Sequence, residues 1–288
     1  MTSDDRRSGR LAAGLLLCAL LSGTPAGAET LLERGTYLMK GIAACGNCHT
    51  MAGGPMAAHE LSGGQKFGEK GFTVFAPNIT PDPATGIGGW TDDQIVAALR
   101  DGTRPDGSLV RPPMPIRFYR VLSDRDVRAI VAYLRAVPPT RNVVSKEAVY
   151  HISLPPSYGP PVTNVPDVPK TDKVAYGRYL AYIGHCLECH TPIGARGRDM
   201  EHAGAGGQEF EGPWGVSVAA NITPDPDTGL GKWSDADIKR AVTSGVRPDG
   251  TKLKPPMAFA YYKNIASDDL DALVAFLRTL KPVVHKVR

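Results

Sequence analysis

"ACGNCHT" spans residues 44–50, and "HCLECHT" spans residues 185–191. Each stretch holds two cysteines three positions apart, and a histidine follows the second cysteine directly. On a helical turn, residues at i, i+3 and i+4 lie on one face, so the two thiols and the imidazole of each stretch point the same way. The chain therefore builds the same cluster of two thiols and one imidazole twice.

The rest of the chain repeats as well. "NITPDPATGIGGW" at residues 78–90 returns as "NITPDPDTGLGKW" at residues 221–233, an offset of 143. The same offset relates Met114 to Met257, and a pair of prolines precedes each of these methionines. The cysteine motifs are 141 apart, so a net two-residue insertion follows the second one. Two copies of one unit predict two domains of one fold.

Proline content marks the boundary between the copies. Residues 138–170 contain Pro155-Pro156, Pro160-Pro161, Pro166 and Pro169. Such a segment favours extended chain and serves as a semi-rigid spacer. We predict a first repeat at residues 29–137, a Pro-rich linker at residues 138–170, and a second repeat at residues 171–288.

Residues 1–28 have the pattern of a signal peptide. Arg6, Arg7 and Arg10 precede an apolar run at residues 11–21, and Ala26-Gly27-Ala28 resembles a cleavage site. The run is shorter than the about 20 residues that span a bilayer. We expect cleavage before Glu29, a periplasmic location and no transmembrane segment in the mature chain; an uncleaved anchor is the alternative.

Composition limits the partners and the fold. The net charge of +4 over 288 residues is too small to indicate nucleic acid or an anionic membrane as a partner. Apolar residues recur at helical spacing around Leu38, Leu99 and Leu134, and Thr91 with Gln94 forms a capping box. No run shows sustained strand alternation. The expected fold class is all-α, with two tandem domains that have long Gly/Pro-rich loops.

Each cysteine motif has the spacing of a c-type haem attachment site. The cysteines would form thioethers with one haem, and the histidine would bind its iron. We therefore predict two covalent haem c groups, attached through Cys45, Cys48, Cys186 and Cys189, with His49 and His190 as iron ligands. A zinc site would need four ligands, and a thioredoxin-like dithiol would need a βαβ pattern that the sequence lacks.

Met114 and Met257 are the candidates for the sixth iron ligand, because they recur at one offset in stiff Gly/Pro-rich loops. Two alternatives stay open. The methionines could fill the core, or His59 and His202, also 143 apart, could make both haems bis-histidine.

Other residues suggest weaker roles. Repeated tryptophans and arginines could donate to haem propionates or could be turn and packing residues, and repeated asparagines could brace the loops; these are Trp90, Trp233, Arg104, Arg247, Asn78 and Asn221. The three histidines that do not recur, His151, His185 and His285, are expected to be ordinary surface residues.

These motifs resemble class I c-type cytochromes, and most closely the multi-haem cytochrome subunits of periplasmic alcohol, aldehyde and gluconate dehydrogenases. Those proteins carry C-x-x-C-H-T, an N-I-T-P-D-P-x-T-G-I-G-x-W segment and a P-x-M-P loop in each haem domain. This chain differs in two ways. It has two such units where those subunits typically have three, and Ala258 rather than proline follows Met257.

The expected function is electron transfer without catalysis. Iron held by His and Met has no open position, so two haems would relay electrons from a dehydrogenase or quinol donor toward a terminal oxidase or a smaller cytochrome. A di-haem peroxidase is the alternative, and it would need one exchangeable haem site and hence unequal repeats. A structural or ligand-sensing module is less favoured, because every cysteine outside the signal peptide is assigned to haem.

Overall fold

The computed structural model describes residues 1, 28–69, 71–194 and 197–287. The predicted signal peptide lies almost wholly outside these residues. The described residues contain ten α-helices: α1 (Leu31–Lys40), α2 (Gly46–His49), α3 (Asp92–Arg100), α4 (Ile116–Tyr119), α5 (Asp124–Ala136), α6 (Lys173–Ile183), α7 (Cys186–Cys189), α8 (Asp235–Ser244), α9 (Phe259–Tyr262) and α10 (Ser267–Leu277). In the part of the chain that is described, none of them is long and apolar enough to cross a membrane.

The all-α expectation is wrong. The described residues also form seven short strands, β1 (Lys66–Glu69), β2 (Phe72–Phe75), β3 (Ala148–Tyr150), β4 (Ile193–Gly194), β5 (Gly197–Arg198), β6 (Glu209–Gly212) and β7 (Gly215–Val218). They pair antiparallel as β1-β2-β3, β4-β5 and β6-β7. No strand exceeds four residues, so none is long enough to show the period-two alternation that marks a strand in sequence.

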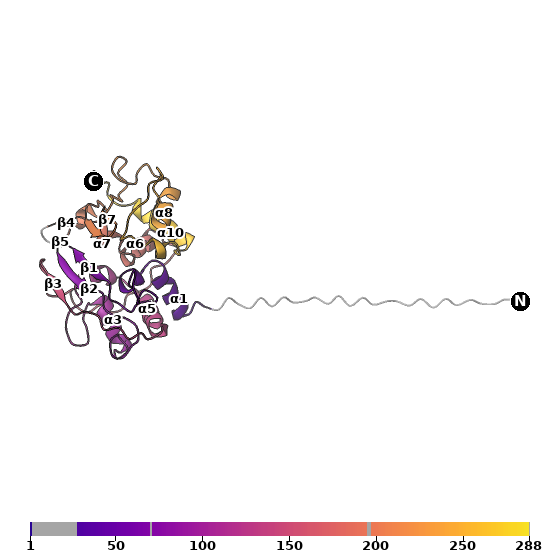
Figure 1. Ribbon diagram of the computed structural model, residues 1–288. Helices are drawn as coiled ribbons and strands as arrows, with labels where there is room; N and C mark the ends of the chain where they lie inside the picture. Colours follow the sequence, from indigo (N-terminus) through magenta and orange to yellow (C-terminus); the bar gives the residue numbers. More distant parts are fainter. Residues whose placement is uncertain (2–27, 70, 195–196, 288) are drawn as a thin grey trace.

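Each repeat is built on a close crossing of its first and last helices. In the first repeat α1 packs on α5, and in the second α6 packs on α10 (Figure 1). Gly35 and Gly177 lie at the crossings, where a Cβ atom would overlap the carbonyl oxygens of Ala129 and Ala272. The two glycines thus let each helix pair approach backbone to backbone.

The predicted capping box is present. Thr91 caps α3, its hydroxyl accepts from the Gln94 backbone N–H, and the Gln94 side chain accepts from the Thr91 backbone N–H. Ser234 caps α8 in the same way with Asp237. These reciprocal bonds satisfy two backbone donors that a helix start leaves free.

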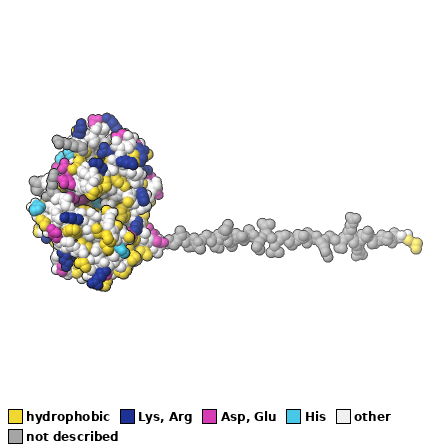
Figure 2. All heavy atoms as spheres, viewed as in Figure 1, with side chains coloured by type: hydrophobic (Ala, Val, Ile, Leu, Met, Phe, Trp, Pro, Cys, Tyr) yellow, Lys and Arg dark blue, Asp and Glu magenta, His cyan; other side chains and the backbone are white. Residues whose placement is uncertain are grey.

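The two repeats share a buried core. One cluster of buried residues contains Leu38 and Ile42 from α1 and its end, and Leu180 and Ile183 from α6. Gly184 faces Ile42 so closely that a Cβ atom there would meet its side chain. On the face shown in Figure 2, basic, acidic and apolar side chains are interspersed, as a net charge of +4 would suggest.

Two tyrosines also cross between the repeats. The Tyr37 hydroxyl donates to Asp269 Oδ2 over 2.7 Å, and the Tyr179 hydroxyl donates to Asp126 Oδ2 over 2.6 Å. The Tyr37 hydroxyl also accepts from the Ala266 backbone N–H (3.1 Å), and the Tyr179 hydroxyl accepts from the backbone N–H of Ser123, which caps α5 (3.4 Å). The first helix of each repeat therefore binds the last helix of the other. We call these two pairs the tyrosine–aspartate clamp.

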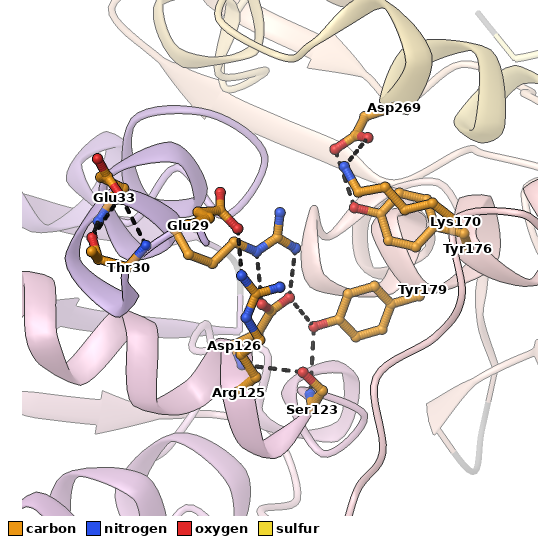
Figure 3. A network of polar contacts seen from close by, with 11 residues as sticks. Glu29, Thr30, Glu33, Ser123, Arg125, Asp126, Lys170, Tyr176, Tyr179 and Asp269 are labelled. Carbon is orange, nitrogen blue, oxygen red and sulfur yellow. Dashed lines mark hydrogen bonds and ion pairs between the residues drawn. The ribbon is translucent and has the colours of Figure 1, made fainter. Parts of the chain in front are cut away.

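The two aspartates of the clamp receive different cations. Arg34 holds Asp126 through two hydrogen bonds of 2.8 Å, with both side chains at most 6% exposed. Asp269 is reached by Lys170 (3.0 Å), and by the hydroxyl of Tyr176 (3.2 Å) (Figure 3). Arg34 directly precedes Gly35, whereas Tyr176 directly precedes the equivalent Gly177. The second repeat thus has no arginine at this position, and Lys170 of the predicted linker supplies the positive charge instead.

The predicted linker makes specific contacts with the first repeat. Its strand β3 extends the β1-β2 hairpin of the first repeat. Tyr150 donates to the Pro112 carbonyl over 2.9 Å, and Arg111 donates to the Pro155 carbonyl over 2.7 Å. The linker therefore braces the loop that carries Met114. The boundaries at residues 138 and 170 stay a prediction.

Candidate haem-binding sites

The two C-x-x-C-H motifs form short helical turns at equivalent places, just after α1 and α6. Turn α2 carries the first motif and α7 the second. All four described cysteines are free thiols, and each is half-buried. The i and i+3 spacing on one turn, which the sequence predicted, is thus present in both repeats.

The thiols lie in apolar surroundings. Burial raises the pKa of each one above the ordinary thiol value, to about 12 for Cys45, about 11 for Cys48, about 12 for Cys186 and about 12 for Cys189. Redox-active dithiols and metal thiolates need the opposite shift, because the thiolate is the reacting form. Neutral sulfur in an apolar crevice suits a thioether.

The motif histidines have a fixed orientation. His49 Nδ1 lies 2.9 Å from the Pro77 carbonyl oxygen, and His190 Nδ1 lies 2.7 Å from that of Ala220. A carbonyl only accepts, so each Nδ1 carries the proton and each Nε2 keeps a free lone pair. Burial lowers the pKa of both imidazoles, which keeps them neutral. A neutral imidazole whose other nitrogen is anchored is the usual form of an iron ligand.

The zinc alternative finds no ligand set in the described ranges. There, no group of three or more His, Cys, Asp or Glu side chains converges to hold a metal ion. The two thiols and the imidazole of each motif fit the attachment groups of a covalent haem in number, chemistry and protonation. Cys45, Cys48 and His49 would hold one haem, and Cys186, Cys189 and His190 the other.

The predicted sixth ligands lie in equivalent loops. Met114 and Met257 are both half-buried and pack against the shared core cluster. Each is followed by a single helical turn, α4 or α9, and the backbone carbonyl of each accepts an N–H from two residues later, from Ile116 (2.9 Å) and Phe259 (3.0 Å). Their role as iron ligands stays a prediction.

The bis-histidine alternative uses residues at the surface. His59 and His202 are both exposed. His202 Nδ1 is paired with Asp199 Oδ2 over 2.7 Å. The two methionines are half-buried and therefore less exposed to solvent than these histidines.

The repeated asparagines brace loops. Asn78 Oδ1 accepts from the backbone and hydroxyl of Thr80, and its Nδ2 donates to Thr85 and to the Thr140 carbonyl (2.7 Å). Asn221 makes the corresponding set in the second repeat. Both side chains are buried. Both asparagines therefore brace their loops, which is the role that the sequence suggested for them.

Two arginines bind the backbone of the repeated tryptophans. Arg135 donates to the backbone carbonyl of Trp90, and Arg278 donates to that of Trp233 (2.5 Å). The offset of 143 would have paired these arginines. The Arg104 guanidinium donates to the Leu109 carbonyl (2.5 Å), and so is engaged by its own loop.

For two of the three histidines that do not recur, the expectation of an ordinary surface residue is wrong. His185 is half-buried, not an ordinary surface residue, and its Nε2 is hydrogen-bonded to the Tyr119 hydroxyl in the first repeat. It has a left-handed backbone with φ of 61° and directly precedes Cys186. Sequence offered no signal, because Ala44 occupies the same position in the first motif. His285 is also half-buried, with Nδ1 2.8 Å from the Ala205 carbonyl.

Comparison with known proteins supports the same assignment. Residues 32–138 match the family model for cytochrome c. The chain is 33% identical to the cytochrome c subunit of a quinone-dependent alcohol dehydrogenase from Gluconobacter oxydans, across 98% of this chain and 62% of that protein. It is 30% identical to the cytochrome c subunit of gluconate 2-dehydrogenase from Pantoea cypripedii, across 94% of this chain and 64% of that protein.

A shorter relative matches along most of both chains. A di-haem c-type cytochrome from Cereibacter sphaeroides is 32% identical, across 83% of this chain and 82% of its own length. The chain spans only about three fifths of the length of the alcohol dehydrogenase subunits that it matches. With its attachment motif, its family match and relatives that are named as cytochrome subunits, the chain belongs to the cytochrome c family of electron-transfer proteins.

Proposed function

We propose that this cytochrome carries two covalent haems and relays electrons between them outside the cytoplasm. The observation that carries the proposal is the repetition of one arrangement: a neutral histidine anchored through Nδ1 to a backbone carbonyl, directly after the second of two half-buried free thiols. The family match covers the first motif alone. The second haem is inferred from the equivalent geometry and supported by the di-haem relative.

Each haem, when bound, would supply an iron that cycles between ferric and ferrous states. His49 and Met114 would bind that iron in the first repeat, and His190 and Met257 would bind it in the second. The anchored imidazoles hold one ligand in orientation, and the proline-stiffened loops hold the other. Thioether sulfur favours the ferrous state and raises the potential. Equal ligand sets in both repeats favour relay over peroxidase chemistry.

The partners are proposed from the relatives. Their names place them in alcohol, gluconate and fructose dehydrogenases. We propose a dehydrogenase or quinol donor and a terminal oxidase or smaller cytochrome as acceptor. The periplasm is the proposed compartment, from the signal-peptide pattern at residues 1–28.

Haem content and spectroscopy test the proposal. The exported, purified chain should give two haems per polypeptide in the pyridine haemochrome assay, and both should stay with the protein in acidified acetone. Reduced protein should not bind carbon monoxide rapidly. One haem per chain would refute the di-haem relay, and rapid carbon monoxide binding with peroxide turnover would favour the peroxidase.

A further inference from the structure

One polar contact joins the two attachment motifs through the interior. Tyr119 of α4 is 3% exposed, and half-buried Cys45 packs against the same buried cluster. The Tyr119 hydroxyl is hydrogen-bonded to His185 Nε2, and the two rings meet edge to face with centroids 5.2 Å apart. His185 is covalently next to Cys186. Two side chains therefore connect the surroundings of the first motif to the second.

The electrostatic surroundings of Tyr119 agree with this placement. Burial raises the pKa of its hydroxyl well above the ordinary value, and the thiols of Cys45 and Cys48 raise it further. Tyr119 therefore lies beside the thiols of the first motif.

His185 is held in a conformation that few side chains adopt. It begins α7 with φ of 61°, a left-handed backbone in which histidine is more frequent than most residues. Ala44 has φ of 46° at the equivalent position before the first motif. The backbone turn is thus common to both repeats, and the imidazole is an addition to the second alone.

The hydrogen bond of the equivalent tyrosine in the second repeat stays within its own repeat. Tyr262 is the counterpart of Tyr119 at the offset of 143, and its hydroxyl donates to the Gly184 carbonyl over 2.8 Å within its own repeat. The Tyr119–His185 bond is therefore no by-product of the duplicated fold. It exists because the second repeat has histidine where the first has alanine.

We propose that Tyr119 and His185 form a bridge for electron exchange between the two haems. This inference rests on the proposed function, because it requires both haems. The exchange moves one electron from the ferrous iron of one haem to the ferric iron of the other. No bond, proton or charge on Tyr119 or His185 changes, and the two side chains act as positioning residues that carry electronic coupling. Coupling falls faster across a gap than through bonds and hydrogen bonds, so a direct contact speeds the exchange.

A second contact is the competing route. Asn47, inside the first motif, donates through Nδ2 to the Pro256 carbonyl over 3.1 Å, and Pro256 precedes Met257. Asn47 is exposed, whereas Tyr119 is buried. Water would compete with the exposed contact, and we therefore favour the buried one.

The test measures exchange between haems in the full-length holoprotein. Partially reduced samples are studied by exchange NMR on resolved haem methyl signals, and dilution separates the intramolecular rate from the intermolecular one. The variants are Tyr119→Phe, His185→Ala, their double variant, Asn47→Ala and the matched control Tyr262→Phe. Haem content and both reduction potentials are measured for each variant, because an altered driving force would also change the rate.

We expect Tyr119→Phe and His185→Ala each to lower the intramolecular rate several-fold, with potentials unchanged. The double variant should be no slower than either single variant, because both remove one link. Tyr262→Phe should keep the wild-type rate. The bridge would be overturned by unchanged exchange rates in both Tyr119→Phe and His185→Ala, or by a rate loss confined to Asn47→Ala. In either case, two haems per chain would still uphold the proposed function. One haem in the wild type would overturn both.

Discussion

The hydroxyl of Tyr37 donates a 2.7 Å hydrogen bond to the carboxylate of Asp269, which lies 232 residues further along the chain. Its counterpart, Tyr179 with Asp126, crosses the interface in the opposite direction over 2.6 Å. The first helix of each repeat is thereby fixed to the last helix of the other. The first helices, α1 and α6, also lead directly into the attachment motifs. The clamp therefore fixes how the two motifs face each other.

Removing one hydroxyl from the clamp should cost stability without disturbing packing. Tyr179→Phe leaves Asp126 with one donor fewer in a buried setting, and a hydrogen bond to a charged group contributes about 1.5–3 kcal/mol. Urea unfolding of the holoprotein, followed by circular dichroism, measures the change. Tyr182→Phe is the matched control, since its ring contacts Phe118 and its hydroxyl has no partner among the described residues. Equal stabilities of the two variants would contradict the role of the clamp.

The Arg34–Asp126 pair predicts a loss of stability in acid. Burial alone would raise the pKa of Asp126, but the hydrogen bonds from Arg34 and Tyr179 and the charges of Arg34 and Arg125 together hold the pKa below its ordinary value. An aspartate whose pKa is lowered on folding stabilises the protein above its unfolded pKa of about 3.9. That contribution should disappear as the pH falls from about 4 through the lower folded pKa.

Asp126→Asn tests this pair directly. The change leaves Arg34 buried without a counter-charge, which typically costs about 3–5 kcal/mol. Unfolding free energies at neutral pH should drop accordingly, and their dependence on pH below about 4 should be weaker than in wild type. An identical acid profile in both proteins would show that other groups control acid unfolding.

The methionine loops predict independent changes at the two haems. Met114→Ala should open a coordination position on the first haem alone, lower its potential and allow carbon monoxide to bind there. Met257→Ala should do the same to the second haem. Reductive titration with and without carbon monoxide measures both effects. Spectra that survive the loss of either methionine would point instead to His59 and His202.

Covalent attachment predicts a simple count. Changing Cys186 and Cys189 together to Ala should leave one haem per chain, and changing Cys45 and Cys48 should do likewise. Each pair contributes the only described cysteines of its repeat. Mass spectrometry of the denatured protein gives the count. Two haems in either double variant would show that the cysteines are not the attachment points.

Sequence predicted the parts of this molecule that depend on local signals. Helix α3 starts after Thr91 and α8 after Ser234, because caps act within one turn. Helix α5 ends two residues before Pro138, whereas α10 ends at Leu277, well before Pro282. Strands of four residues or fewer carry no periodic signal, so the hairpins were missed.

Local sequence patterns could not predict the contacts between the repeats. Nothing around Tyr37 distinguishes it from any other tyrosine on a helix, and its partner is set by how the two repeats dock. The internal duplication did contain a usable hint, since Asp126 and Asp269 recur at the offset of 143. His185 left no such trace, because the first repeat has Ala44 there.

The buried cluster that includes side chains of both repeats has a consequence for autonomy. A duplicated unit can in principle be cut at its connection and used alone, but here each copy supplies part of the interior of the other. At Gly46, in the first motif, a Cβ atom would lie only 2.2 Å from the Tyr261 hydroxyl of the second repeat, so this position has room for glycine alone. Single repeats expressed separately should therefore expose apolar surface and aggregate, and the intact chain should unfold in one cooperative step. The two repeats therefore form a single folding unit.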